Sequence, residues 1–447
     1  MARDPERDRL SGRVARFARV GAGLSGAAAT IGANAIFGAG DLDARNARAM
    51  KEALGRLKGP VMKVAQIMAT IPDLLPPEFA EEFTQLQTNA PAMGPAFVRR
   101  RMAAELGVQW QKRFGSFDLH PAAAASLGQV HKAAAADGTP LAVKLQYPEM
   151  QSAVESDLAQ LRAFMSVVRR LYASLDTREV VEELGARLRE ELDYDREAKA
   201  MDLYRTFFAS RDDIHIPEPI ADLSTGRLLT MTWLDGDGLL AVKSADQETR
   251  NHVARILFEG WWTPLIHMGI IHGDPHLGNY SFADGGRRLN LLDFGCIRIF
   301  PPAFVGGVVK LFHAMSTGDK AGEADAYRAW GFKDLSQDLM DVLGIWARFI
   351  YAPLLDDRVR TVADGVAPSH YGRREAFQVK QALDQKGPVT IPREFVFMDR
   401  AAIGLGAAFL HLAAEQNWRR LFEASLEGFS EAALAERQAK ALAAAGF

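Results

Sequence analysis

The chain has 447 residues, of which 48% are apolar and 24% charged, an ordinary balance for a folded protein with room for two or three domains. Its formal net charge of -3 gives no reason to expect nucleic acid as a partner. The single cysteine, Cys296, excludes an intrachain disulfide and a cysteine-based zinc cluster, and it fits a reducing cytoplasm.

The first 40 residues fall into a basic segment and an uncharged one. Six arginines precede residue 20, and the stretch 20–40, VGAGLSGAAATIGANAIFGAG, has no charge. It is long enough to cross a membrane, but its glycines and alanines make insertion marginal. Three interpretations stay open: a disordered linker, a helix that touches a membrane or dimerises through its small residues, and a true span. A cleaved signal peptide is not expected, because a leucine-rich centre is missing.

The segment 41–113 is predicted to be a helical extension that precedes all strands. Its helices are expected over 41–57, 61–68, 78–87 and 95–106. The pair Gly59-Pro60 separates the first two, since both residue types interrupt helices. On the residues alone, Lys63 and Gln66 are interpreted as the exposed polar face of the second helix.

Strand patterns begin after residue 114 and define the next domain. They are expected over 127–133, 139–147, 214–220 and 227–233. The first two strands are joined by Ala-Asp-Gly-Thr, a hairpin signal, and a charged helical region is expected over 177–210. Glycines at 236 and 238 indicate a hinge, so we predict a first lobe over 114–235 and a second lobe over 236–447.

The most informative motif lies in the second lobe. It reads His272-Gly273-Asp274-Pro275-His276-Leu277-Gly278-Asn279, and Asp293-Phe294-Gly295 follows. The intervening residues, 280–292, predict a hairpin that returns Asn279 and Asp293 to the same end. Amide and carboxylate oxygens suit Mg²⁺, so these two residues are predicted metal ligands beside nucleotide phosphates, and Asp274 is predicted to accept a proton from a hydroxyl or water. The alternative is a polar turn followed by an ordinary strand.

A phosphate-binding cation and an acid that orients it would complete such a site. Lys144 ends an apolar strand and is predicted to be the cation. The acid is expected within 190–197, and Glu191 is assigned to Lys144. Because Glu191 and Glu197 are too far apart on a helix to make the same contact, they are expected to serve two partners. The alternatives are a surface lysine and a solvated acidic face.

An alanine run precedes Lys144 at the place where a kinase carries a glycine-rich loop. The segment 121–129 reads PAAAASLGQ, and its backbone amides are expected to approach phosphate in a stiffer loop. Taken alone, such a run is an ordinary loop or helix start. The predicted nucleotide-binding residues are Ala123, Ala124, Ala125, Ser126, Lys144, Thr232 and Leu234.

The chain after residue 251 is expected to be mainly helical, apart from the catalytic hairpin. An apolar helix over 401–412 is too short to cross a membrane and is predicted to be buried in the C-terminal domain. Trp330, Trp346 and Trp418 lie in helical segments and are predicted to pack in the core.

Together these residues resemble the UbiB/ADCK family of atypical kinase-like proteins, which are linked to coenzyme Q. The resemblance covers about residues 41–300. The matching residues are Ala122–Ser126, Lys144, Glu191-Leu192-Asp193, Asp274, Asn279, Asp293 and Lys63-Val64-Ala65-Gln66. Ala65 stands where the family has glycine and Leu277 where it usually has proline, and neither departure removes a charged or ligating group.

The resemblance implies an α+β, two-lobed protein-kinase-like fold with an N-terminal helical extension and extra C-terminal helices. It also implies that ATP and Mg²⁺ bind between the lobes, and that Lys63 and Gln66 point into the cleft with Glu197 as the partner of Lys63. The implied activity is that of an ATPase or a small-molecule phosphotransferase supporting ubiquinone biosynthesis at a membrane.

The implied partners are ATP, a membrane lipid or quinone precursor, and other ubiquinone-biosynthesis proteins, with a homodimer left open. The expected location is the cytoplasm, at the periphery of the inner membrane. Two further hypotheses remain. A small-molecule kinase of the aminoglycoside-phosphotransferase kind shares the Asp274 motif but does not explain Lys63 and Gln66. A non-enzymatic, nucleotide-gated scaffold would bind lipid or protein.

Overall fold

The computed structural model describes residues 93–125, 127–148, 188–333, 335–364 and 392–447, with isolated positions between 150 and 186. The segment 1–40, the three helices predicted before residue 90, the Lys63–Gln66 motif and Ser126 lie outside the described residues. The chain forms two compact units. The first contains the residues up to Glu197 together with Pro219–Trp233, and the second contains Ala198–Glu218 and Leu234–Phe447.

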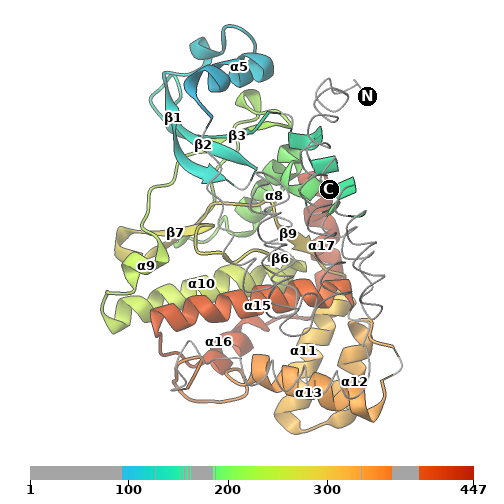
Figure 1. Cartoon of the computed structure of the whole chain (residues 1–447). Helices are drawn as coiled ribbons and strands as arrows, with labels where there is room; N and C mark the ends of the chain where they lie inside the picture. The colour runs from blue at the N-terminus through green and yellow to red at the C-terminus, as the bar shows by residue number, and fades with distance from the viewer. Residues whose placement is uncertain are drawn as a thin grey trace, which may run out of the picture. The chain divides into compact units, whose positions relative to one another are not determined.

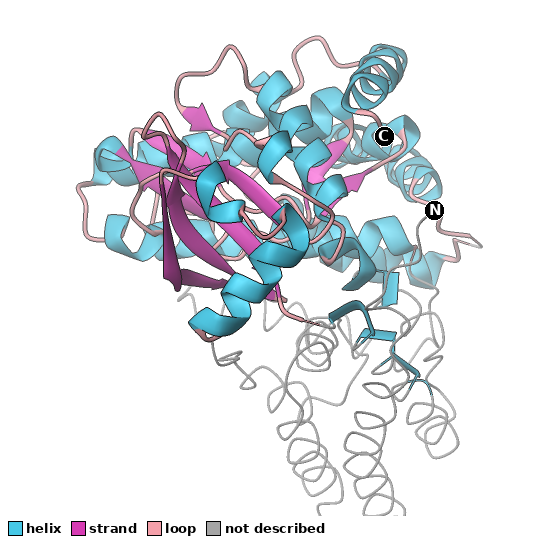
Figure 2. Ribbon diagram, turned by 90° about the horizontal axis from the view of Figure 1, so that it is seen from above, coloured by secondary structure: helices cyan, strands magenta, loops and turns pink. Residues whose placement is uncertain are grey.

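The first unit is built on an antiparallel sheet in the order β1-β2-β3-β5. Figure 1 labels β1, β2 and β3, and Figure 2 draws the strands in magenta. Its elements are α5 (Pro95–Leu106), η1 (Trp110–Arg113), β1 (Ser116–Ala125), β2 (Gly128–Ala134), β3 (Pro140–Gln146), η2 (Ala221–Leu223) and β5 (Leu228–Thr232). Val98 and Met102 of α5 share one fully buried cluster with Val143 and Leu145 of β3. Burial of each such side chain contributes roughly 1.5–3 kcal/mol, so α5 is part of the core of this unit.

Among the described residues of this unit, the predicted helix and hairpin and one predicted strand are confirmed. The helix over 95–106 is α5, the hairpin over 127–147 is β2 and β3, and the strand over 227–233 is β5. The strand predicted over 214–220 is much shorter, since only β4 (Ile214–His215) forms a paired strand and Pro219 makes a single isolated bridge with Met231. Prolines at 217 and 219 explain the difference, because proline has no N–H for a strand ladder.

The alanine run is a strand, where the sequence favoured a loop or a helix start. Ala123, Ala124 and Ala125 are the last residues of β1 and pair with the start of β2. The register between the two strands shifts on both sides of Pro121. The run is therefore held by cross-strand pairing, which its own composition does not reveal.

The second unit is mainly helical and contains two small sheets, β4-β8-β7 and β6-β9. Helix α8 (Tyr194–Phe207) begins in the first unit and continues into the second. The remaining elements are β4 (Ile214–His215), α9 (Leu239–Val242), α10 (Gln247–Met268), β6 (Ile270–His272), β7 (Tyr280–Ala283), η3 (Asp284–Gly286), β8 (Arg288–Leu291), β9 (Ile297–Ile299), α11 (Pro302–Thr317), α12 (Lys320–Ala329), α13 (Gln337–Tyr351), α15 (Arg393–Leu412), α16 (Trp418–Ser425) and α17 (Glu431–Ala445).

Helix α10 is the central helix of this unit, and local signals fix both of its ends. Asp246 caps its start by accepting the N–H of Thr249, and Gly269 ends it in the left-handed conformation. Gln438 of α17 donates to the carbonyl of Met268 and to that of Phe300, both at 2.9 Å. The C-terminal helix therefore satisfies carbonyls at the point where α10 leads into β6.

Helix α15 runs alongside α10 (Figure 1) and confirms the buried helix predicted over 401–412. Ala401, Leu405 and Ala408 are fully buried. Trp330 and Trp418 are buried as predicted, whereas Trp346 is half-buried. The rings of Trp330 and Trp346 contact each other and Phe395 in T-shaped or tilted arrangements, and the ring centroid of Trp418 lies 4.7 Å from that of Phe409. Within the part of the chain that the structure describes, no helix combines the length and hydropathy needed to cross a membrane.

Asp399 of α15 is a half-buried residue whose carboxyl group is largely shielded from water, so its removal is expected to stabilise the protein. Its Oδ1 accepts the indole N–H of Trp346 at 2.6 Å, and burial raises the pKa of Asp399 from 3.8 to about 6. Because the folded-state pKa is raised, the folded state binds the proton more tightly, and stability falls as the pH rises from about 4 to about 6. Asp399→Asn should raise the free energy of unfolding at pH 7 by up to about 3 kcal/mol in urea titrations. The gain should shrink towards zero at pH 4, and a gain that does not change with pH would contradict this assignment.

Candidate functional site

Lys144 lies in the middle of the first unit's sheet and forms a buried ion pair. Strand β3 pairs on both edges, and Lys144 stands opposite Val130 of β2 and Leu229 of β5. Its Nζ donates to both carboxylate oxygens of Glu197, at 2.7 and 3.0 Å. The two side chains are only 10% and 2% exposed. A charge removed from water needs its partner, so the pair fixes the direction of the ammonium group.

The acid that pairs with Lys144 is Glu197, and the assignment of this role to Glu191 is corrected. The run 190–197 is not one continuous helix, because α8 begins only after Asp193. The carboxylate of Asp193 accepts the backbone N–H of Arg196 at 2.9 Å and caps the new helix. Glu197 therefore lies in the first turn of α8, whereas Glu191 precedes the helix.

In the second unit, His272 joins the two acidic motifs through their backbones. Its Nε2 donates to the carbonyl of Asp293 at 2.5 Å, and its Nδ1 accepts the N–H of Asp274 at 3.2 Å. The ring is fully buried, and burial lowers the pKa of His272 below its ordinary value, which keeps the imidazole neutral at pH 7. Trp261 of α10 donates its indole N–H to the carbonyl of His272 at 2.9 Å. This buried network holds the Asp274 loop beside the Asp293 turn.

Asn279 closes the same loop from its other end. Its Nδ2 donates to the backbone carbonyl of Asp274 at 2.9 Å, and its backbone carbonyl accepts the N–H of Leu292 at 2.9 Å. Since Nδ2 faces the carbonyl, Oδ1 points away from it. The predicted hairpin of β7 and β8 is thus confirmed, and it returns Asn279 to the residue next to Asp293.

Two contacts hold the Asp293 turn: a hydrogen bond to the Asp293 carboxylate and the packing of the neighbouring Phe294. The Oδ1 of Asp293 accepts the N–H of Gly295 at 3.0 Å, which orients the carboxylate. Phe294 is fully buried, and its ring lies 5.3 Å from that of Tyr204 in α8. The carboxylate therefore rests on a segment whose adjacent side chain is packed in the core.

The donor set at this end of the hairpin fits Mg²⁺. Asn279 and Asp293 supply an amide oxygen and a carboxylate, both hard ligands. Among the described residues, no three histidine, cysteine, aspartate or glutamate side chains form a metal-binding group. Mg²⁺ commonly takes one or two protein oxygens and completes its octahedron with phosphate and water, so two such ligands suffice.

The other predicted nucleotide-binding residues are spread along the first unit and its boundary. Ala123–Ala125 end β1, Thr232 ends β5, and Leu234 is the first residue of the next segment of the second unit. Trp233, between the last two, lies under the Lys132 ammonium group, 4.3 Å from Nζ to the ring centroid. The roles of Ser126, Lys63 and Gln66, and the contact of Glu197 with Lys63, fall on residues outside the described ones and stay predictions.

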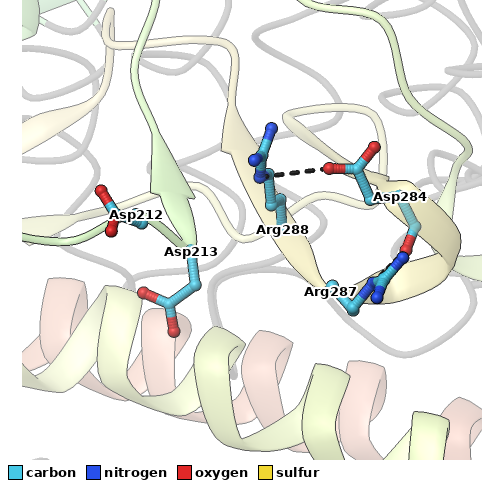
Figure 3. Close-up of a pocket in the computed structure, with 5 residues that line it drawn as sticks. All are labelled: Asp212, Asp213, Asp284, Arg287 and Arg288. Carbon is cyan, nitrogen blue, oxygen red and sulfur yellow. Dashed lines mark hydrogen bonds and ion pairs between the residues drawn. The ribbon is translucent and has the colours of Figure 1, made fainter.

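An open cavity lies at the turn of the β7–β8 hairpin (Figure 3). Its lining residues are Asp212, Asp213, Asp284, Arg287 and Arg288. The Arg288 guanidinium points towards the Asp284 carboxylate and pairs with it at 3.1 Å (Figure 3). The turn is the end of the hairpin opposite to Asn279, so the cavity is separate from the predicted metal ligands.

Sequence reasoning missed the structural roles of His272, Asp193 and Glu197. The sequence did carry a signal for the cap at Asp193, because an aspartate placed just before a helix commonly accepts the backbone N–H of the residue three positions later. Recognising that cap would have placed Glu197 in the first turn of the helix. His272 gave no comparable signal, since its two hydrogen-bond partners come from opposite sides of the hairpin.

The fold and these two groups of residues are those of a protein-kinase-like domain with additional helices. The ABC1 atypical kinase-like domain matches residues 85–326, more than half of the chain. The chain therefore belongs to the family of ABC1 atypical kinase-like proteins, which confirms the resemblance inferred from its motifs.

Two relatives and one solved structure illustrate the similarity. The chain is 31% identical to "Atypical kinase coq-8, mitochondrial" of Caenorhabditis elegans, over 72% of this chain and 45% of that protein. It is 27% identical to "Atypical kinase COQ8, mitochondrial" of Saccharomyces cerevisiae, over 70% of this chain and 64% of that protein. It thus spans about half the length of the curated relatives it matches. The complex of Rv3197 with erythromycin, from Mycobacterium tuberculosis, aligns with a TM-score of 0.59 at 26% identity, over 84% of this chain and 94% of that one.

Proposed function

We propose that this protein is an ATP-binding atypical kinase or ATPase that uses Mg²⁺. The observation that carries the proposal is the buried network around His272, which holds Asp274 and Asp293 side by side with Asn279. An aspartate, an asparagine and a second aspartate in this order are the groups that protein-kinase-like enzymes use for the acceptor and the metal ion.

Each group has a distinct part in the proposed chemistry. Lys144, held by Glu197, contacts the phosphates of ATP, and Asn279 and Asp293 hold the metal ion. Bound Mg²⁺ would neutralise charge on the phosphate oxygens. Asp274 orients the acceptor hydroxyl or water and accepts its proton, a task that suits a half-buried carboxylate held by its backbone.

We further propose that this activity supports ubiquinone biosynthesis at a membrane surface, with a lipid or quinone precursor as ligand. Relatives named COQ8 and the family resemblance support this role. Ubiquinone-biosynthesis proteins are the proposed partners. The uncharged segment 20–40 is the proposed membrane contact, because it follows a stretch rich in arginine.

A turnover assay tests the proposal directly. Phosphate release from ATP should require Mg²⁺ and should rise when vesicles of anionic lipid, with or without a phenolic quinone-precursor analogue, are added. A chain that lacks residues 1–40 should hydrolyse ATP without responding to vesicles. Hydrolysis that is absent with and without lipid, together with no detectable ATP binding, would reject the function.

A small-molecule kinase is the second candidate, and one specific finding favours it. The solved structure of Rv3197 contains erythromycin, so a protein of similar fold takes a small hydroxylated molecule. Transfer of the γ-phosphate to a hydroxylated antibiotic, detected by mass spectrometry, would support this candidate. Phosphate release to water alone, unchanged by such acceptors, would favour the ATPase.

A further inference from the structure

Helix α15 contacts the loop between β6 and β7, which carries Asp274 and is called the catalytic loop below, and the contact on the helix is made by a glycine. Gly404 of α15 faces Pro275, the residue that follows Asp274. A Cβ added at Gly404 would lie 2.3 Å from Cγ of Pro275 and 3.4 Å from its Cβ and Cδ. The first distance is well inside van der Waals contact, so an alanine at 404 would force the helix or the loop to move.

Pro275 is a rigid point at which to contact this loop. Its ring is buried and is closed onto the backbone, so it cannot turn aside like a flexible side chain. The rest of the loop is also held. Gly273 donates its N–H to the carbonyl of Cys296, and Asn279 donates its N–H to the carbonyl of His276, both at 2.9 Å. A displacement of Pro275 would therefore also displace its neighbour Asp274.

We propose that Gly404 is a positioning residue for the catalytic loop, and that α15 sets the place of Asp274 through Pro275. This inference rests on the proposed function, in which Asp274 orients the acceptor. The contact joins the C-terminal helical part of the chain to the reacting groups. It makes α15 part of the active-site scaffold.

The chain offers a matched control on the same helix. Gly406 lies two residues further along α15, and a Cβ added there meets nothing within 4 Å. Gly404→Ala and Gly406→Ala make the same chemical change, and both favour the helix, because alanine is the better helix former. A difference between the two variants therefore reports the contact with Pro275.

The kinetic test compares both variants with wild type and adds Pro275→Ala alone and in combination. Gly404→Ala should lower kcat for Mg-ATP hydrolysis about 10- to 100-fold with little change in KM. This is the usual result when a catalytic group, here Asp274, is displaced by about 1 Å. Gly406→Ala should match wild type. The double variant should match Pro275→Ala alone, since the Cβ that remains at 275 lies 3.4 Å from the added one.

Hydrogen exchange separates this inference from the proposed function. The backbone N–H groups of Gly278 and Asn279 are bonded to His276, and they should exchange faster in Gly404→Ala but not in Gly406→Ala. If wild type neither hydrolyses nor binds ATP, the proposed function fails while this exchange readout still tests the contact. Equal kinetics and exchange in the two glycine variants would overturn the inference. So would a further loss of turnover when Gly404→Ala is added to Pro275→Ala.

Discussion

Asp293→Asn is expected to lower Mg-dependent ATP turnover by about 100-fold or more. The substitution removes one negative charge and one hard ligand while keeping the shape of the side chain. Its remaining carbonyl oxygen can still accept the N–H of Gly295, so the turn should keep its conformation. The loss should appear in kcat and in the Mg²⁺ concentration that gives half-maximal turnover, and thermal unfolding should be nearly unchanged.

Asp284→Asn is the matched control for this variant. Asp284 lies at the turn of the same hairpin, is 47% exposed and has a positive φ of 51°, which asparagine also tolerates. Its only expected loss is the exposed ion pair with Arg288, which contributes at most about 1 kcal/mol to stability. Equal turnover in Asp293→Asn and wild type would refute the metal assignment. An equal loss in both variants would indicate general damage to the hairpin.

Substitutions in the Lys144–Glu197 pair should affect stability and ATP binding differently. Lys144→Met or Glu197→Leu alone removes one half of the buried ion pair and should cost roughly 3–5 kcal/mol of unfolding free energy. The double variant buries two apolar side chains in place of the charges, so its stability should return close to that of wild type. ATP binding should be lost in Lys144→Met and in the double variant, because each lacks the ammonium group.

Double-mutant cycles also test whether Glu197, and not Glu191, is the acid that pairs with Lys144. The coupling energy of Lys144 with Glu197 in urea unfolding should be several kcal/mol, since the pair is buried and makes two hydrogen bonds. The coupling of Lys144 with Glu191 should be smaller, because Glu191 precedes α8. A larger coupling with Glu191 would restore the original assignment.

The β7–β8 hairpin and the strand of Lys144 could be predicted because their signals are local. An Asp-Gly-Gly turn between two apolar runs specifies a hairpin, and an apolar run that ends in lysine specifies a buried strand with one functional group. The acid that pairs with Lys144 could not be chosen in the same way. The run 190–197 contains five acidic residues, and only the cap at Asp193 decides which of them enters α8 in its first turn.

Other features depend on partners far away in the chain. The alanine run became a strand through pairing with β2, and its composition alone favours several structures. Gly404 is one glycine among several in a helical pattern, and its contact with Pro275 exists only in the folded chain. His272 likewise acquires its role from two backbones that the hairpin brings together. Such tertiary contacts have no local signature in the sequence.

Calorimetric titration of the full-length chain with ATP, with and without Mg²⁺, tests the central claim most directly. We expect wild type to bind ATP at one site in the presence of Mg²⁺, and the stable Lys144→Met/Glu197→Leu variant to show no binding heat under the same conditions. Asp293→Asn should lose the dependence of binding on Mg²⁺. Mg-dependent ATP binding of equal affinity in all three proteins would contradict the account.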